Sequence, residues 1–351
     1  MSIPPESTNK TFTVTKTGNK YAYIHHRPSN LKQPTLLLVH GFPSTSYEWR
    51  HQITFLLSLG YGILAPDLLG YGSSSKPLSV EPYIGSSMAS DIISILDHES
   101  IENVSGVGHD WGTYLLSQLI IWYPERIERC VFVSVPFGVP GRQTDAKALN
   151  EKSREVLGFE TLGYWMFLTD PKAGKAIGDN WETFFNVVYC TDASLWKTHF
   201  APLGAMEKTL KTLTPESSSK YLAPWVNEKD KKHHHASFGN DYSPSLNWYH
   251  RAISSLGVDD EIAALKSGQI SAKIKIPTLM IGGTKDVVCD ARHARKSMEA
   301  SVDGGSKGGK LKVVDLDTGH WVMLERRDEF NKVLGEWLEE TSEEGTARAR
   351  L

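Results

Sequence analysis

The chain has 351 residues, with 38 Lys and Arg against 41 Asp and Glu. This near balance, without long runs of one sign, argues against a nucleic-acid or anionic-membrane surface. Three scattered cysteines disfavour a disulfide framework, and no apolar run approaches the roughly 20 residues of a membrane span. The polar start "MSIPPESTNK" does not resemble a signal peptide, so we expect a soluble protein of the cytoplasm.

The first third of the chain alternates β-rich and helical segments. Such alternation predicts βαβ units and a mainly parallel sheet with helices on both faces. The pattern returns near the C-terminus, after a long interruption. The expected strands are 11–16, 21–26, 35–40, 62–67, 103–110, 128–136, 276–283 and 311–317, and the expected helices are 48–60, 86–100, 111–126, 291–302 and 326–340.

The interruption is rich in aromatic residues and helix formers, which indicates a helical insertion between two strands of the sheet. Within it, 214–220 and 228–245 resemble loops, and so does 303–310 in the second part of the core. We therefore predict an α/β core with an inserted helical cap. The expected boundaries are 1–138 for the first part of the core, 139–265 for the cap, 266–345 for the second part and 346–351 for a tail.

The stretch "VGHDWGTY" places Asp110 between Gly108 and Gly112, where an apolar strand runs into an apolar helix. This is the spacing of a nucleophile elbow, G-x-S-x-G, with aspartate in place of serine. Because Asp is also a favoured N-cap, the motif alone does not distinguish a helix cap from a nucleophile.

The segment "HGFP" follows the strand 35–40 directly. In an elbow fold, the loop at this position and the residue after the nucleophile each supply a backbone N–H to an oxyanion hole. Here those residues are Phe42 and Trp111. Their side chains are also expected to form walls of the substrate pocket, and Trp165 is a further candidate.

Two residues near the C-terminus complete the chain order nucleophile, acid, histidine. His320 follows the last strand in "DLDTGHW", and Asp286 ends "PTLMIGGTKD". Asp317 is an alternative orienting acid, only three residues from the histidine. We favour Asp286 because the loop after the preceding strand normally approaches that histidine.

A nucleophilic aspartate indicates the class of substrate. When a carboxylate attacks a saturated carbon, the product is an ester, and water activated by His320 can hydrolyse this ester at the carbonyl carbon of Asp110. Epoxides and alkyl halides are the two common electrophiles of this kind. Opening an epoxide also needs a proton donor, for which Tyr164 and Tyr249 are candidates, although buried tyrosines commonly make structural hydrogen bonds.

Taken together, the segments "HGFP", "PDLLGYGSSSKP", "GHDWG", "NWY", "GTKD" and "TGHW" resemble the soluble epoxide hydrolases of the α/β-hydrolase fold. The resemblance covers nearly the whole chain. It implies that Asp110 is the nucleophile, His320 the base and Asp286 the orienting acid. It also implies that Tyr249 and, on a looser match, Tyr164 protonate the epoxide oxygen. No added N-terminal phosphatase domain is expected.

Two other functions remain open. A dehalogenase shares the fold and the Asp–His–acid set, whereas a non-catalytic receptor usually lacks a triad member, and this chain has all three. No cofactor or metal is expected, because the adjacent histidines of "KKHHH" (231–235) lack ligand spacing and read as a solvated loop. We expect a monomer or homodimer. The ending Ala349-Arg350-Leu351 resembles a peroxisomal import signal, so peroxisomes are an alternative location.

Overall fold

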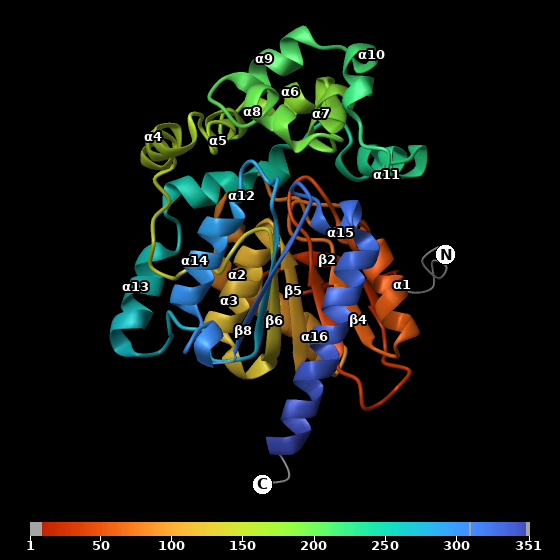
Figure 1. Cartoon of the computed structure of the whole chain (residues 1–351), viewed down its shortest axis with the longest axis vertical. Coiled ribbons are helices and arrows are strands. Elements are labelled where there is room, and N and C mark those ends of the chain that lie inside the picture. The colour runs from red at the N-terminus through yellow and green to blue at the C-terminus, as the bar shows by residue number, and fades with distance from the viewer. Residues whose placement is uncertain (1–8, 309, 349–351) are drawn as a thin grey trace.

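The computed structural model describes residues 9–308 and 310–348 and has an α/β architecture (Figure 1). An eight-stranded sheet has the order β1-β2-β4-β3-β5-β6-β7-β8. The first two pairs, β1–β2 and β2–β4, are antiparallel and the remaining five pairs are parallel, so the predicted mainly parallel sheet is confirmed. The strands are β1 (Asn9–Thr13), β2 (Lys20–His26), β3 (Thr35–Val39), β4 (Gly62–Pro66), β5 (Val104–His109), β6 (Ile127–Val133), β7 (Thr278–Gly283) and β8 (Leu311–Leu316).

The central strands are buried along their whole length, as expected for a sheet with helices on both faces. Every residue of β3, β4, β5 and β7 is buried. Helices α1 and α16 contact each other, and α2 and α3 form a second pair (Figure 1). The core helices are α1 (Arg50–Ser58), α2 (Gly85–His98), α3 (Trp111–Trp122), α14 (Ala291–Ser301), α15 (Val322–Glu325) and α16 (Arg327–Arg348).

A helical segment between β6 and β7 lies above the carboxyl ends of the parallel strands (Figure 1). The elbow and the histidine loop are at the same edge of the sheet, so this cap covers them. Its helices are α4 (Ala146–Leu157), α5 (Tyr164–Leu168), α6 (Ala173–Asp179), α7 (Trp181–Val188), α8 (Trp196–His199), α9 (Ala205–Thr212), α10 (Pro215–Ser218), α11 (Glu228–Phe238), α12 (Ser243–Ser254) and α13 (Val258–Ser267).

The loops predicted in the cap are wrong. Residues 228–238 form α11, which begins with a capping box in which Asn227 and Asp230 satisfy each other's backbone N–H groups. The stretch 214–220 contains α10 and a short 3₁₀ turn, η6 (Ser219–Tyr221), and Thr214 caps it. The loop expected at 303–310 includes a 3₁₀ turn, η7 (Ser306–Gly308). In the two cap stretches, local capping outweighs a polar composition.

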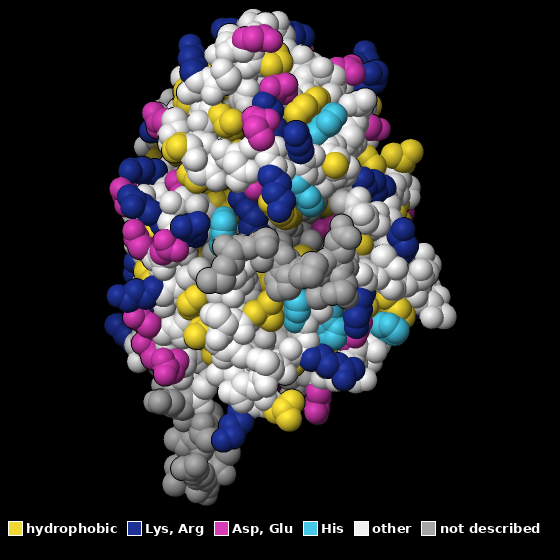
Figure 2. Space-filling view, turned by 90° about the vertical axis from the view of Figure 1, so that its right-hand side faces the viewer, with side chains coloured by type: hydrophobic (Ala, Val, Ile, Leu, Met, Phe, Trp, Pro, Cys, Tyr) yellow, Lys and Arg dark blue, Asp and Glu magenta, His cyan; other side chains and the backbone are white. Residues whose placement is uncertain are grey.

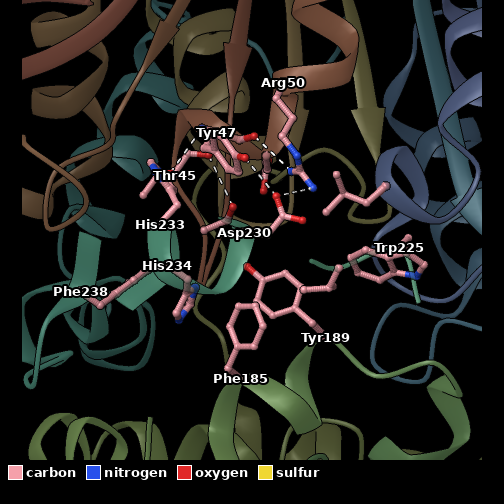
Figure 3. A pocket seen from close by; sticks show the side chains of 14 residues that line it. Thr45, Tyr47, Arg50, Phe185, Tyr189, Trp225, Asp230, His233, His234 and Phe238 are labelled. Carbon is pink, nitrogen blue, oxygen red and sulfur yellow. Dashed lines mark hydrogen bonds and ion pairs between the residues drawn. The ribbon is translucent and has the colours of Figure 1, made fainter. Parts of the chain in front are cut away.

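Helix α11 docks on the core loop that follows β3 (Figure 3). The Tyr47 hydroxyl donates to Asp230 at 3.0 Å, and the Arg50 guanidinium lies 3.3 Å from the same carboxylate. The His233 ring stacks on Tyr47 with centroids 4.1 Å apart, while Thr45 lies 3.1 Å from its Nε2. The histidine run is therefore part of the contact between cap and core and not a solvated loop.

On the face shown in Figure 2, basic and acidic side chains are interspersed. Within the described residues, no helix is both long and apolar enough to cross a membrane. Helix α16 extends to Arg348, beyond the expected end at residue 340. The import signal predicted at 349–351 lies outside the described residues and stays a prediction.

Candidate active site

The elbow projects Asp110 from the end of β5 at the start of α3. Its backbone has φ +50° and ψ −123°, a conformation that non-glycine residues rarely adopt. Strain of this kind is typical of active sites, where the surrounding structure holds it in place. The Asp110 side chain makes no capping hydrogen bond to the helix, so the carboxylate is available for other contacts.

Three glycines allow the close packing around this carboxylate. A Cβ atom on Gly41 would lie 2.4 Å from the Asp110 Cβ, and one on Gly112 would lie 2.1 Å from the carbonyl oxygen of Val39. At Gly108, the added atom would meet the Gly112 carbonyl at 2.7 Å. Side chains at these positions would separate the elbow from the β3 loop.

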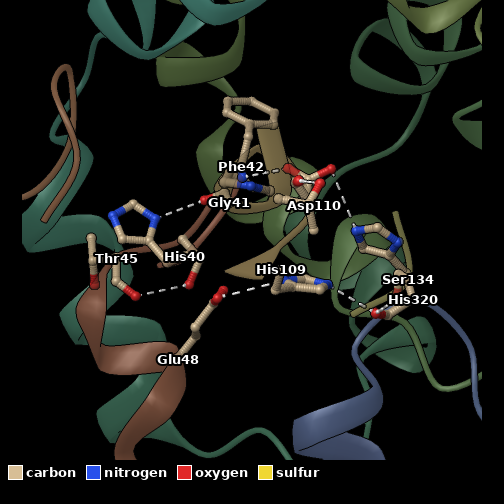
Figure 4. Close-up of polar contacts among 12 residues, drawn as sticks. His40, Gly41, Phe42, Thr45, Glu48, His109, Asp110, Ser134 and His320 are labelled. Atoms are coloured by element: carbon tan, nitrogen blue, oxygen red, sulfur yellow. Dashed lines mark hydrogen bonds and ion pairs between the residues drawn. The ribbon is translucent and has the colours of Figure 1, made fainter. Parts of the chain in front are cut away.

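The β3 loop supplies a hydrogen bond to the carboxylate. The backbone N–H of Phe42 donates to Asp110 Oδ1 at 2.8 Å (Figure 4). The second expected donor is the backbone N–H of Trp111, the first residue of α3, which directly follows Asp110. This N–H makes no hydrogen bond within the described chain. One amide is thus already placed on the carboxylate, and the other has its hydrogen-bonding capacity unused.

On its other side, Asp110 faces the loop that follows β8. His320 Nε2 lies 3.8 Å from Asp110 Oδ2, and His320 Nδ1 lies 2.7 Å from Asp286 Oδ2. Asp286 Oδ1 accepts the backbone N–H groups of Val288 and Cys289, both at 3.0 Å. The orienting carboxylate is therefore fixed at both oxygens.

Asp317, the alternative acid, does not approach the histidine. It is 64% exposed at the side chain and forms an ion pair with Lys285 at 2.8 Å. The structure brings Asp110, His320 and Asp286 together and leaves Asp317 at the surface.

The environment of His320 favours its charged form. Burial lowers its pKa, but the charge and hydrogen bond of Asp286, together with the charge of Asp110, outweigh burial and raise the pKa to about 9. At neutral pH the ring is therefore an imidazolium between two carboxylates. It becomes a base only when it loses this proton.

The cap places both candidate tyrosines near the elbow. Tyr164 begins α5 and Tyr249 lies in the middle of α12, with ring centroids 6.1 Å apart. Burial is the largest cause of their strongly raised pKa values, and the negative charge of Asp110 adds to it. Both phenols are thus neutral hydroxyl donors at neutral pH. The Tyr249 ring also packs edge-on against Trp111 at 5.1 Å.

A cavity of about 340 Å³ opens above the elbow. Asp110, Trp111, Tyr164 and Trp165 all line it, together with residues of α12, α13 and the segment after β6. Phe42 and Tyr249 are not in its lining; they pack edge-on against each other at 5.3 Å. The indole N–H groups of Trp111 and Trp165 are buried and lack hydrogen-bond partners among the described residues.

A second buried pair, Glu48 and His109, was not found by sequence reasoning. The Glu48 carboxylate is buried, lies 3.5 Å from His109 Nδ1 and has no hydrogen bond among the described residues (Figure 4). On the opposite edge of the ring, His109 Nε2 lies 3.1 Å from the backbone oxygen of His320. Burial raises the pKa of Glu48 to about 8 and lowers that of His109 to about 3. At neutral pH, Glu48 is therefore protonated and His109 is neutral, and His109 contacts the backbone of His320.

One group of side chains has the chemistry of metal ligands. Among the described residues, the ligand atoms of Asp286, Cys289 and His320 lie within 4.8 Å of one another. Asp286 and His320 are already hydrogen-bonded to each other, so an ion bound there would prevent His320 from acting as a base.

Comparisons with known proteins identify the family of this chain. The family model of the alpha/beta hydrolase fold matches residues 34–327. Epoxide hydrolase 3 of Siraitia grosvenorii is 31% identical, over 85% of this chain and 89% of its own length. Bifunctional epoxide hydrolase 2 of Sus scrofa is 28% identical over 96% of this chain, which spans only 56% of that longer protein.

Among solved structures, epoxide hydrolase VrEH1 of Vigna radiata superposes with a TM-score of 0.73 at 25% identity. The superposition covers 96% of this chain and 100% of the plant protein. The predicted fold is thus confirmed along almost the entire chain. By fold and by sequence, this chain belongs to the epoxide hydrolases of the α/β-hydrolase fold.

Proposed function

We propose that the protein adds water to an epoxide and releases a vicinal diol, through an ester formed on Asp110. The observation that carries this proposal is the set of contacts around one carboxylate. Asp110 accepts the Phe42 N–H at 2.8 Å and faces His320, which Asp286 holds at 2.7 Å. The charge of Asp110 also contributes to the raised pKa values of two neutral phenols of the cap, Tyr164 and Tyr249.

In the first step, a carboxylate oxygen of Asp110 attacks one carbon of the epoxide, and the bond from that carbon to the ring oxygen breaks. A tyrosine hydroxyl donates its proton to the leaving oxygen, so the product is a hydroxyalkyl ester and a tyrosinate. The proton that His320 loses then balances the one given up by Tyr164 or Tyr249. His320 is left neutral and the tyrosine is restored.

Esterification itself prepares the base for the second step. It removes the negative charge that lies 3.8 Å from His320 Nε2, and the pKa of His320 falls. The neutral ring accepts a proton from water, whose oxygen attacks the carbonyl carbon of Asp110. The N–H groups of Phe42 and Trp111 stabilise the resulting oxyanion, and each such donor typically contributes about 3–4 kcal/mol. When the intermediate collapses, the departing alkoxide takes the proton from His320, and the new carboxylic acid of Asp110 gives its proton to the ring, which restores the starting carboxylate and imidazolium.

Dehalogenation is the second candidate, and one observation favours it. A departing halide needs N–H donors and no proton, and the unpartnered indole N–H groups of Trp111 and Trp165 line the cavity. The two tyrosines have no task in that reaction. Because both phenols are neutral and lie within reach of the charge of Asp110, we place epoxide hydrolysis first.

The two reactions are separated by their products. The purified protein is offered styrene oxide and 1-chlorobutane in parallel, and diol and chloride are measured. We expect diol from the epoxide and little or no chloride. In His320→Gln, ring opening should proceed without ester hydrolysis, so mass spectrometry should find one added substrate mass on the peptide that contains Asp110. Chloride release with no diol would replace this proposal with dehalogenation, and Asp317→Asn is the control that should form no adduct.

A further inference from the structure

The active-site cavity contains a buried arginine that the proposed reaction does not use. Arg251 lies on α12, two residues after Tyr249, and is 7% exposed. It lines the same cavity as Asp110. Its guanidinium carbon lies 3.7 Å from the ring centroid of Tyr114 and 5.8 Å from that of Trp111.

This guanidinium has no carboxylate partner. Within residues 9–308 and 310–348, Arg251 forms no ion pair at 4.0 Å or less, and its Nε hydrogen has no hydrogen-bond acceptor. The face of an aromatic ring attracts a cation, and the Tyr114 hydroxyl interacts with the same guanidinium, but neither supplies a negative charge and the Nε hydrogen keeps no acceptor in the described part of the chain. A buried cation without an anionic partner is unfavourable, so a bound anion would complete this site.

The other charged groups of the cavity do not complete it. Glu261 lines the cavity too, but its Oε1 accepts from the Gln118 amide at 2.9 Å and its Oε2 from the Gly141 N–H at 2.7 Å. Arg142, also in the lining, is exposed. The charge of Asp110 is balanced by His320, which it faces. The remaining charged side chains of the lining are two arginines and one glutamate, which leaves an excess of positive charge. The cavity therefore favours an anion.

We propose that Arg251 binds a carboxylate of the substrate, and that the protein acts on epoxides that carry this group near the ring. This inference rests on the proposed epoxide hydrolysis and specifies its substrate class. A guanidinium presents paired N–H donors that match the two oxygens of a carboxylate. Trp111 directly follows the nucleophile and its ring centroid lies 5.8 Å from the guanidinium carbon, and Arg251 and Asp110 line the same cavity, so the bound anion would lie near the epoxide.

The test compares matched acids and amides. Terminal epoxyalkanoates of increasing chain length are assayed beside the corresponding primary amides, and the acid-to-amide ratio of kcat/KM is measured for each length. Charge-assisted hydrogen bonds of this kind correspond to a preference of about 10- to 100-fold. We expect the ratio to peak at one short chain length in the wild type. Arg251→Met should remove the peak, and Arg251→Lys should retain part of it.

Two controls keep the result interpretable. Arg154 is an exposed cap arginine that pairs with Glu160, so Arg154→Met should leave the ratio unchanged. If Arg251→Met does not fold, inhibition of the wild type by alkanoates and alkanamides gives the same information, and alkanoates should bind at least about 10-fold more tightly. Amides turned over as well as acids at every length would overturn the role of Arg251 while leaving epoxide hydrolysis intact. Failure to turn over any epoxide would overturn the proposed function itself.

Discussion

Removing the charge of Asp110 should convert His320 from an acid to a base near neutral pH. The relevant distance is 3.8 Å, between Asp110 Oδ2 and His320 Nε2. With an effective dielectric constant of about 20 to 40, two unit charges at this distance attract by about 2–4 kcal/mol. Since one pKa unit corresponds to about 1.4 kcal/mol, Asp110→Asn should lower the pKa of His320 by about 1.5–3 units from its value of about 9.

The assay is a pH titration of histidine resonances by NMR, in protein labelled at the histidine rings. His320 is identified by its absence in His320→Gln. Asp317→Asn serves as the control, because Asp317 pairs with Lys285 at the surface and should not affect the titration. A pKa of His320 that stays within half a unit in Asp110→Asn would refute the reasoning. Formation of the ester on Asp110 would then not lower the pKa of His320 enough to make it a base at neutral pH.

Three further predictions concern the groups around this pair. Asp286→Asn removes the charged partner of the 2.7 Å hydrogen bond, so kcat should fall by about 10²- to 10⁴-fold with little change in KM, as measured by steady-state diol formation. Tyr164→Phe combined with Tyr249→Phe should abolish ring opening, and the adduct should then be absent in the His320→Gln background; a normal adduct yield would remove both tyrosines from the mechanism. The folded state holds a proton on Glu48 up to a pKa of about 8, whereas the unfolded chain releases it near 4.5, so stability from this group is full below pH 4.5 and lost as pH rises through 8. Glu48→Gln should therefore raise the free energy of unfolding at pH 7 by about 3 kcal/mol and change it little at pH 4.5, by chemical denaturation.

The sheet was predictable because its signals are local. All eight expected strands overlap the observed ones, since continuous apolar runs such as "TLLLV" become strands buried on both faces. The helix at 228–238 was not predictable from its sequence, because its capping box and its docking on Tyr47 outweigh a polar composition. Whether a polar segment forms a loop or a docked helix depends on what it packs against.

The site shows the same division between local and distant signals. The motif around Asp110 and the chain order of Asp286 and His320 are visible in the sequence, and the structure brings these residues together. Neither Glu48 nor Arg251 carries a motif. Their importance comes from burial of polar atoms that have no hydrogen-bond partner among the described residues, namely the Glu48 carboxyl oxygens and the Arg251 Nε hydrogen. This burial depends on residues as distant in the sequence as His109 and Tyr114. Only a folded chain shows that these polar atoms are buried without partners.

The central claim is that the diol oxygen comes from the enzyme's own carboxylate. A single turnover with enzyme in excess, run in ¹⁸O-enriched water, tests it directly. We predict that the first-formed diol contains no label and that the peptide bearing residue 110 gains one ¹⁸O atom. A diol labelled in that first turnover, with an unlabelled Asp110, would mean that water attacks the epoxide directly and would contradict the account.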